Sequence, residues 1–198
     1  VSVILAQNDS IGISPIRPSS LFKKPTSNAG SDATICENAT YTSATATATN
    51  YNTVVWSSNG NAGTISNASS LTGMVYTPSA TDLVNGSVTL TLTANGNSCQ
   101  PPVSDDVVIR FQKLPVITVP SNTAMCANQN TFAIGGVSIT PTTAYNTNSV
   151  VWTTTGTGTF SPSGNALNPI YNPSTDDIAA GFVNLTITVS PIAPCVTA

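Results

Sequence analysis

The sequence contains two copies of one module. The stretch VVWSSNG, followed by MVYTPSATDLVNGSVTLTL, returns nearly a hundred residues later as VVWTTTGTGTF and PIYNPSTDDIAAGFVNLTITV. The repeated residues have nearly the same spacing in both copies, because 20 residues separate Trp56 from Tyr76 and 19 separate Trp152 from Tyr171. A chain of 198 residues that repeats itself in this way predicts two domains of ordinary size for a small β-fold.

Apolar and polar residues alternate along the most regular stretch of each copy. Val88, Leu90 and Leu92 alternate with threonines in the first copy, and Val183 and Leu185 open the same pattern in the second. A period of two is typical of a β-strand with one buried face. About seven such short runs, each bounded by turn residues, predict an all-β chain of two tandem immunoglobulin-like β-sandwiches. The alternating Thr and Ala of residues 41–50 predict one of these strands.

The repeat also sets the expected domain boundaries. Residues 1–27 match neither copy and are predicted to be an extended segment or linker, whereas residues 28–117 form the first repeat and residues 118–198 the second. Only three residues follow Cys195, where the first repeat continues into the strand-like run DVVIRF. We therefore expect the second repeat to lack its last strand within this chain. Either a longer chain supplies that strand, or another chain donates one, for which Val1–Leu5 is a candidate.

Composition narrows the class of protein. Charged residues make up 7% of the chain, against about 25% in typical soluble domains, so neutral hydroxyls and amides must cover the surface. The net charge of −3 and the absence of a basic patch argue against a nucleic-acid partner. No apolar run approaches the roughly 20 residues of a membrane-spanning helix. Such a composition favours an extracellular protein.

The four cysteines fall at matching places in the two repeats. Cys36 and Cys99 are 63 residues apart, and Cys126 and Cys195 are 69 apart. Four cysteines allow three pairings, and the repeat favours the one in which each repeat closes its own disulfide, Cys36–Cys99 and Cys126–Cys195. Zinc would need paired cysteines at closer spacing or histidine partners, and the sequence has neither. Two disulfides imply an oxidising compartment.

Several repeated residues resemble a site because they recur. Trp56 and Trp152 are predicted to be the core tryptophans of the two sandwiches, with stacking on sugars as the alternative. In the motif Tyr-x-Pro-Ser-x-x-Asp, the tyrosines are Tyr76 and Tyr171, and the aspartates are Asp82 and Asp177. We expect the motif to build a turn, in which serine caps a short helix and aspartate accepts backbone N–H groups. Calcium binding by the aspartates is the alternative, although calcium requires six to eight oxygen ligands.

The sequence offers no catalytic constellation. It contains no histidine, which removes the commonest general base and excludes Ser-His-Asp and Cys-His arrangements. The glycine-rich run that begins at Gly156 is flanked by strand-like sequence rather than by the start of a helix, so it is not a phosphate loop. We therefore predict a protein that is not an enzyme and that holds no metal or other cofactor.

The repeated motif resembles a known class of bacterial surface repeat. The string W-[ST]-x-x-G-x-G-x-[IF] followed by Y-x-P-S-x-x-D-x-x-x-G-x-V-x-L-T-[LI]-T is similar to the tandem immunoglobulin-like or PKD-like repeats of large cell-surface adhesins of gliding Bacteroidota-type bacteria, of which the SprB-type gliding-motility adhesins are the example. The residues that match in the second repeat are Trp152, Gly156, Gly158, Phe160, Tyr171, Pro173, Ser174, Asp177, Gly181, Val183, Leu185 and Thr186. The first repeat departs from the string at residues 59–65.

The resemblance covers residues 28–198 and carries functional expectations. It implies type IX secretion, a stalk or filament at the bacterial cell surface, and a role in adhesion and gliding. Asp9-Ser10-Ile11 is similar to the O-glycosylation signal of these bacteria, which would make Ser10 a glycosylation site.

Three functions follow as hypotheses. The first is a structural and adhesive region whose partners are other modules of the same chain, with a surface polysaccharide as a candidate target. The second is a fibre subunit that polymerises by strand donation between neighbouring subunits. The third is a carbohydrate-binding appendage of a secreted enzyme, for which Tyr51 and Tyr145 are candidate exposed aromatic residues.

Overall fold

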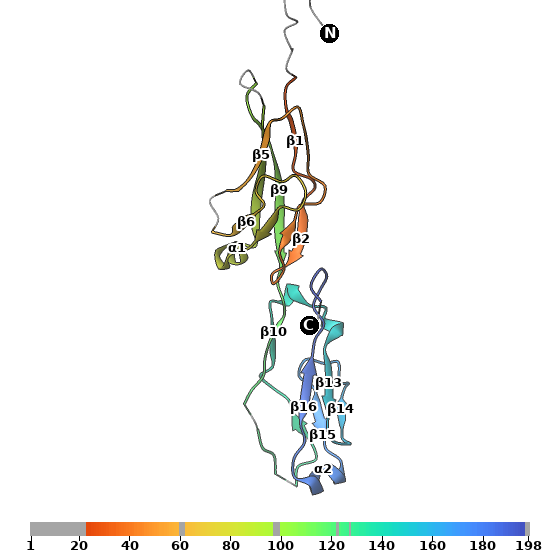
Figure 1. The fold of residues 1–198 in the computed structure, drawn as a ribbon. Coiled ribbons are helices and arrows are strands. Elements are labelled where there is room, and N and C mark those ends of the chain that lie inside the picture. The colour runs from red at the N-terminus through yellow and green to blue at the C-terminus, as the bar shows by residue number, and fades with distance from the viewer. Residues whose placement is uncertain (1–22, 60–61, 97–99, 122, 127, 197–198) are drawn as a thin grey trace, which may run out of the picture. The chain divides into compact units, whose positions relative to one another are not determined.

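The structure, a computed structural model, describes residues 23–196 apart from 60–61, 97–99, 122 and 127. These residues form an all-β chain of two immunoglobulin-like β-sandwich modules, which confirms the predicted fold class (Figure 1). The chain divides into two compact units. The first unit comprises the described residues up to Ala33 together with Thr40–Ile109, and the second comprises Thr34–Ala39 together with the described residues from Arg110 onward. The second unit therefore includes two segments that belong to the first repeat in sequence, Thr34–Ala39 and residues 110–117.

The predicted N-terminal segment lies mostly outside the described residues. This holds for residues 1–22, and with them for Ser10 and for the candidate donor strand Val1–Leu5. None of the described helices is both long and apolar enough to span a membrane.

The first repeat consists of short strands and one short helix. Its elements are β1 (Thr26–Asn28), β2 (Ala33–Cys36), β3 (Tyr41–Thr42), β4 (Thr47–Thr49), β5 (Thr53–Ser58), β6 (Thr64–Ser66), β7 (Val75–Thr77), α1 (Ala80–Asn85), β8 (Ser87–Asn95) and β9 (Val103–Gln112). One sheet has the strand order β2-β9-β8-β5, another has the order β3-β7-β6, and β1 pairs with β4. The inward residues of β8 are fully buried, as its alternating pattern predicts, because strands flank β8 on both sides.

The strand predicted over residues 41–50 is interrupted. β3 ends at Thr42, and the next residue, Ser43, still binds the segment before β7, since its backbone N–H donates to Met74 O (2.9 Å) and its hydroxyl donates to Leu71 O (3.0 Å). The chain then moves from one sheet to another, since β3 pairs with β7 whereas β4 pairs with β1. The prediction of one continuous strand is therefore wrong, because the small-residue alternation does not reveal a change of sheet.

The second repeat follows the same order of elements, without counterparts of β2 and β9 among its described residues. They are β10 (Val116–Thr118), β11 (Phe132–Ala133), β12 (Ser138–Thr140), the 3₁₀ turns η1 (Thr142–Ala144) and η2 (Thr147–Ser149), β13 (Val151–Thr154), β14 (Thr159–Ser161), β15 (Ile170–Asn172), α2 (Thr175–Ala180) and β16 (Leu185–Thr188). Strands pair as β11-β15-β14, β13-β16 and β10-β12. The two 3₁₀ turns occupy the loop that makes this repeat longer between its cysteine and its tryptophan.

The cores of the two repeats contain equivalent residues. Trp56 and Tyr76 are 3% and 0% exposed in the first repeat, and Trp152 and Tyr171 are 7% and 2% exposed in the second. Both indole N–H groups donate to a backbone carbonyl, that of Ser70 at 2.9 Å and the equivalent carbonyl in the second repeat at 3.3 Å. Both tryptophans are therefore enclosed core residues, which leaves no ring face available for sugar stacking.

Candidate functional site

The Tyr-x-Pro-Ser-x-x-Asp motif forms the same corner in both repeats. Ser79 is the N-cap of α1, where its hydroxyl accepts the N–H of Asp82 (3.2 Å) and its own N–H donates to Asp82 Oδ2 (2.7 Å). Such a reciprocal capping box satisfies two N–H groups that a helix end leaves without partners. Gly86 ends the helix with φ of 79°, a left-handed conformation that glycine adopts at little cost. The motif thus builds a helix of one and a half turns that begins and ends at residues specified by the sequence.

A buried tyrosine hydroxyl completes each corner. Tyr76 Oη donates to Asp82 Oδ2 at 2.7 Å, and Tyr171 Oη donates to Asp177 Oδ2 at the same distance. Asp82 is 0% exposed and Asp177 is 6% exposed. A buried carboxylate without partners is costly, so these donors are what allow the aspartates to lie inside the fold.

Backbone N–H groups from the preceding hairpin supply further donors. Thr157 N–H donates to Asp177 Oδ1 (2.9 Å) and Gly158 N–H donates to Asp177 Oδ2 (3.0 Å). A Cβ atom at Gly156 or Gly158 would collide with the Asp177 carboxylate, and one at Gly63 would collide with the corresponding tyrosine of the first repeat. The glycines of the GTG run therefore allow the backbone to approach the carboxylate. Sequence reasoning missed this role, although the equal distance of 19 residues from Gly63 to Asp82 and from Gly158 to Asp177 was a signal for it.

Hydrogen bonds tune the ionisation of the corner. Those from Tyr171 first, and then from the Ser174 N–H, hold the pKa of Asp177 at about 2, below its ordinary value. Burial alone would raise the pKa of Asp82, but hydrogen bonds from Ser79, Tyr76 and Gly63 together outweigh burial and lower it. Burial also raises the pKa of Tyr76 and Tyr171, with a further contribution from the neighbouring carboxylate. Each corner is therefore a neutral tyrosine bonded to an ionised aspartate.

The corner presents donors to the aspartates rather than a set of cation ligands. The partners of Asp177 are N–H and O–H groups, which would face a bound cation with their hydrogens. Asp82 Oδ1 is buried and has no hydrogen-bond partner among the described residues, whereas the equivalent Asp177 Oδ1 accepts the Thr157 N–H. Within the described part of the chain, no group of three or more potential metal ligands lies together. The geometry assigns the aspartates a structural role.

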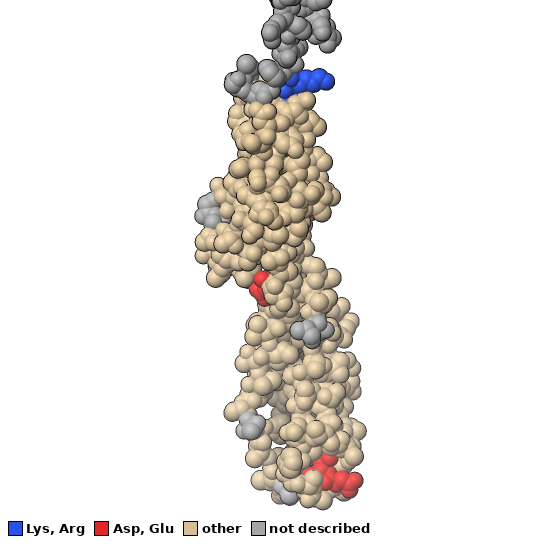
Figure 2. Space-filling model, viewed as in Figure 1, with Lys and Arg blue, Asp and Glu red and all other residues tan. Residues whose placement is uncertain are grey.

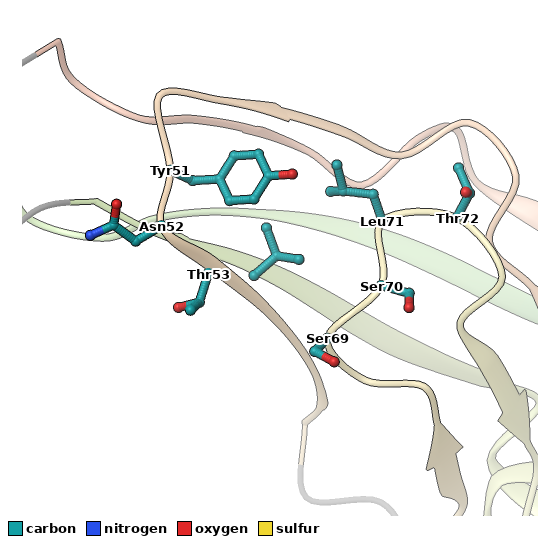
Figure 3. Close-up of a pocket in the computed structure, with 8 residues that line it drawn as sticks. Tyr51, Asn52, Thr53, Ser69, Ser70, Leu71 and Thr72 are labelled. Carbon is teal, nitrogen blue, oxygen red and sulfur yellow. The ribbon is translucent and has the colours of Figure 1, made fainter.

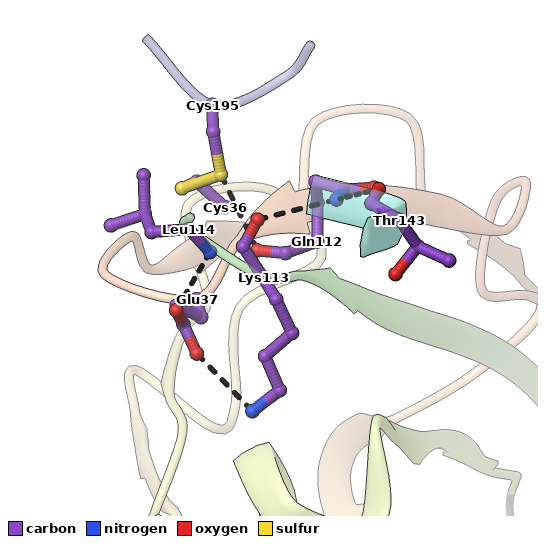
Figure 4. The surroundings of a disulfide bond; sticks show 7 residues. All are labelled: Cys36, Glu37, Gln112, Lys113, Leu114, Thr143 and Cys195. Carbon is purple, nitrogen blue, oxygen red and sulfur yellow. Dashed lines mark hydrogen bonds and ion pairs between the residues drawn. A yellow bond between two sulfur atoms is a disulfide. The ribbon is translucent and has the colours of Figure 1, made fainter. Parts of the chain in front are cut away.

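The disulfide pattern differs from the predicted one. Cys36 is bonded to Cys195, 159 residues away in sequence, and Cys126 is an exposed free cysteine (Figure 4). The prediction that each repeat closes its own disulfide is therefore wrong for Cys36 and Cys195. Cys99 lies outside the described residues.

The strand arrangement explains why Cys36 pairs as it does. Cys36 ends β2, and the next residue, Glu37, donates its N–H to the carbonyl of Gln112 at the end of β9 (3.0 Å). β9 begins at Val103, so its whole length separates its first residue from the end beside Cys36. Ten residues of strand span roughly 33 Å, whereas bonded cysteines need Cα atoms within about 7 Å. Cys195 instead lies with its Sγ 3.3 Å from Gln112 O, beside Cys36.

An open pocket in the first repeat contains the one candidate aromatic residue that the structure leaves partly exposed. Tyr51 is 37% exposed and lies with its ring over a pocket of about 420 Å³ (Figure 3). Its other lining residues are Asn52, Thr53, Val54, Ser69, Ser70, Leu71 and Thr72. Tyr145, the second candidate, is only 7% exposed, so the prediction of an exposed ring there is wrong. Tyr145 lies in the longer loop of the second repeat, where its backbone forms a bridge with Pro191 after β16.

Charged side chains are sparse on the visible face of the molecule (Figure 2). One described ion pair joins Lys113 Nζ to Glu37 Oε2 at 3.2 Å, beside the disulfide. The Glu37 carboxylate also accepts the N–H of Leu114 (2.8 Å). The few charges near Cys36 thus help to fix the segment that carries it.

Comparisons with known proteins found a similar solved structure but no matching family. No protein-family model matches the chain, and no curated protein matches it. Among solved structures, it is similar to protocadherin gamma B2 extracellular cadherin domains 3–6, with a TM-score of 0.45 and 14% sequence identity. The match covers 85% of this chain and 47% of that chain, so this chain spans about half the length of the solved structure.

Proposed function

We propose that this chain is a non-enzymatic structural repeat region of a secreted cell-surface adhesin, in which β-sandwich repeats follow one another to form a stalk or filament. The observation that carries the proposal is the sharing of residues between repeats. Thr34–Ala39 comes from the first repeat but belongs to the second compact unit, and Cys36 within it is bonded to Cys195. A chain of independent binding modules has no need of such sharing, whereas a load-bearing series gains a compact unit that is closed covalently by a segment of the preceding repeat.

Two further features support an extracellular location. Disulfides persist in oxidising compartments and are rare in the cytosol, so the Cys36–Cys195 bond favours export. The scarcity of charge leaves a surface of neutral hydroxyls and amides, which suits a spacer that does not attract charged molecules. The resemblance of the repeat motif points to the SprB-type gliding-motility adhesins, type IX secretion and the surface of a Bacteroidota-type bacterium. A surface polysaccharide is the proposed target.

Immunolabelling of intact cells tests this proposal. Antibodies raised against the purified chain should label unpermeabilised cells of the bacterium that carries the sequence, and they should reduce attachment of those cells to a polysaccharide-coated surface. Labelling that appears only after permeabilisation would refute the surface location. The adhesive role would be refuted if the antibodies label the surface without reducing attachment and if deletion of the gene does not reduce attachment either. The stalk would then have a structural role alone.

A fibre subunit completed by strand donation is the second candidate. The observation that favours it is that β16 pairs only with β13 among the described residues, whereas its counterpart β8 has strands on both sides. A peptide of residues 103–112, the β9 sequence, should then add to β16 and protect its amides from hydrogen exchange. The same experiment with a peptide of residues 1–7 tests donation by the N-terminal segment. If neither peptide protects β16, this candidate fails.

A further inference from the structure

Cys36 and Cys126 occupy equivalent positions in the two repeats. A tight turn follows each of them, since Ala39 N–H donates to Cys36 O and Gln129 N–H donates to Cys126 O, both at 2.9 Å. The equivalence is therefore visible in local structure as well as in sequence.

The strands that follow these turns confirm the alignment. After Cys36 the chain enters β3, where Tyr41 is paired with Tyr76. After Cys126 it enters β11, where Phe132 is paired with Tyr171. An aromatic residue thus lies opposite the corner tyrosine in both repeats.

The bond that Cys36 forms is directed to the following repeat. Its partner Cys195 lies beyond the last strand of the second repeat and is 3% exposed, while Cys36 is 7% exposed. Six residues around Cys36, Thr34–Ala39, belong to the second compact unit. The cysteine segment of one repeat therefore completes the unit formed by the next.

We infer that Cys126 has the same role toward a further copy of the repeat. Its partner is the cysteine equivalent to Cys195 in the repeat that follows, so that successive repeats are joined by a staggered series of disulfides. Cys126 is exposed and free in this chain, as a segment that completes another unit would be, and Cys195 is already bonded. The inference rests on the part of the proposed function in which further repeats follow these two, and it does not depend on adhesion.

Formation of this bond is an oxidation. Two thiols, that of Cys126 and that of the partner cysteine, lose two electrons and two protons as their S–S bond forms. A disulfide reagent such as oxidised glutathione, or a protein disulfide of the exporting compartment, accepts both and leaves as two thiols by thiol–disulfide exchange.

An extended chain tests the inference directly. In this chain, residues 1–195 are followed by a second copy of residues 100–198. Because positions 99 and 195 are equivalent, the added copy supplies the second repeat with β9 and then adds a third repeat in register. The added copy carries serine in place of its own Cys126. The two copies of Cys195 remain distinguishable by mass, since one precedes Gln100 and the other precedes Val196. The protein is oxidised with glutathione, digested without reduction and mapped by mass spectrometry.

The expected result is two bonds in one molecule, Cys36 with the first Cys195 and Cys126 with the added Cys195. Replacement of the original Cys126 by serine should abolish only the second bond. Only molecules in which the Cys36–Cys195 bond is intact are counted, because that bond shows that the second unit has folded. A bond from Cys126 to Cys99, or a free Cys126 thiol in these molecules, overturns the inference. The inference is also overturned if the unextended chain does not form the Cys36–Cys195 bond.

A second extended chain controls for an added repeat that cannot form the bond. In it, residues 34–39 replace residues 124–129, so the receiving segment is the one already bonded to Cys195. A new bond in this chain but not in the first overturns the role of Cys126 alone. Absence of a new bond in both chains overturns the staggered series. Neither outcome bears on cell-surface labelling, so the inference and the proposed function fail separately.

Discussion

The two repeats share the same corner but differ in the burial of the strand that follows it. In β8, Leu90 and Leu92 are 0% exposed, because β9 and β5 lie on either side. Their counterparts in β16, Leu185 and Ile187, are only half-buried, because β13 is the only neighbour of β16 among the described residues. The same alternating sequence thus gives different burial in the two repeats. A strand acquires its burial from its neighbours, whereas the corner is specified by residues close in sequence.

The loss of one strand also affects a second. β2 of the first repeat lies next to β9 in the sheet. In the second repeat, the described residues just before Cys126 form no strand, and the described chain has no counterpart of β9 beyond β16. β2 and β9 therefore form together, which is why the predicted absence of one last strand leaves this sheet with two strands instead of four.

The largest expected effect concerns the disulfide. Cys36→Ser should destabilise the second unit by roughly 2–5 kcal/mol, because the bond closes a very long loop and its loss relaxes the unfolded state. The first unit should be much less affected, although Cys36 belongs to the first repeat in sequence. Urea unfolding followed by the fluorescence of Trp152, in a Trp56→Phe background, reports on the second unit, and the reciprocal background reports on the first.

The matched control for that experiment is Cys126→Ser. It removes an exposed thiol without a disulfide partner in the structure and should leave both transitions in place. A larger shift in the Trp56 transition than in the Trp152 transition would mean that the bond stabilises the first unit instead.

The corner should respond more strongly in the second repeat. Asp177→Asn places an amide N–H₂ group against a donor whichever way the amide turns, so it should lower the free energy of unfolding of its unit by about 2–3 kcal/mol. Asp82→Asn should cost less, because its N–H₂ group can take the Oδ1 position, which has no donor among the described residues. Asp176→Asn is the control, because that side chain is exposed beside Asp177. Equal costs, measured by the same two fluorescence signals, would show that the absence of a donor at Asp82 Oδ1 gives no such relief.

The pH dependence of stability should also report on these corners. The folded pKa of Asp177 is about 2, below its ordinary value near 4 in an unfolded chain. A lowered folded pKa contributes stability that is fully present above about pH 4 and is lost as pH falls toward 2. The unfolding midpoint of the second unit should therefore fall over this window, and Asp177→Asn should flatten the dependence. A variant with an unchanged pH dependence would assign the acid sensitivity to other carboxylates.

Local features of the fold could be predicted from the sequence, and long-range ones could not. The capped turn is specified by Ser79, Asp82 and Gly86, which lie within eight residues of one another. The alternation that begins at Val88 predicts a strand with one buried face. Which cysteine bonds to Cys36 depends on which end of β9 lies beside Cys36, and the spacing of the cysteines in sequence does not contain that information.

The role of the hairpin glycines shows the same limit. Gly158 and its counterpart Gly63 each lie 19 residues before the aspartate of their repeat, so their importance is visible in the sequence. Their purpose is not, because the approach of the hairpin backbone to a buried carboxylate is a tertiary contact. A resemblance in motif therefore predicts the fold of the repeat more firmly than its connection to the next one.

The smallest expected effect separates the two corners. Ser79→Ala and Ser174→Ala each remove an N-cap, which costs about 1 kcal/mol. Ser174 Oγ also lies 2.6 Å from Thr157 Oγ1, whereas Ser79 Oγ donates to Asp82 at 2.8 Å. Ser174 therefore ties its helix to the hairpin, and a double-mutant cycle with Thr157→Val should give a coupling of about 0.5 kcal/mol or more. A coupling of zero would mean that the N–H groups of the hairpin hold Asp177 without help from this hydroxyl pair, and the two corners would then be energetically alike.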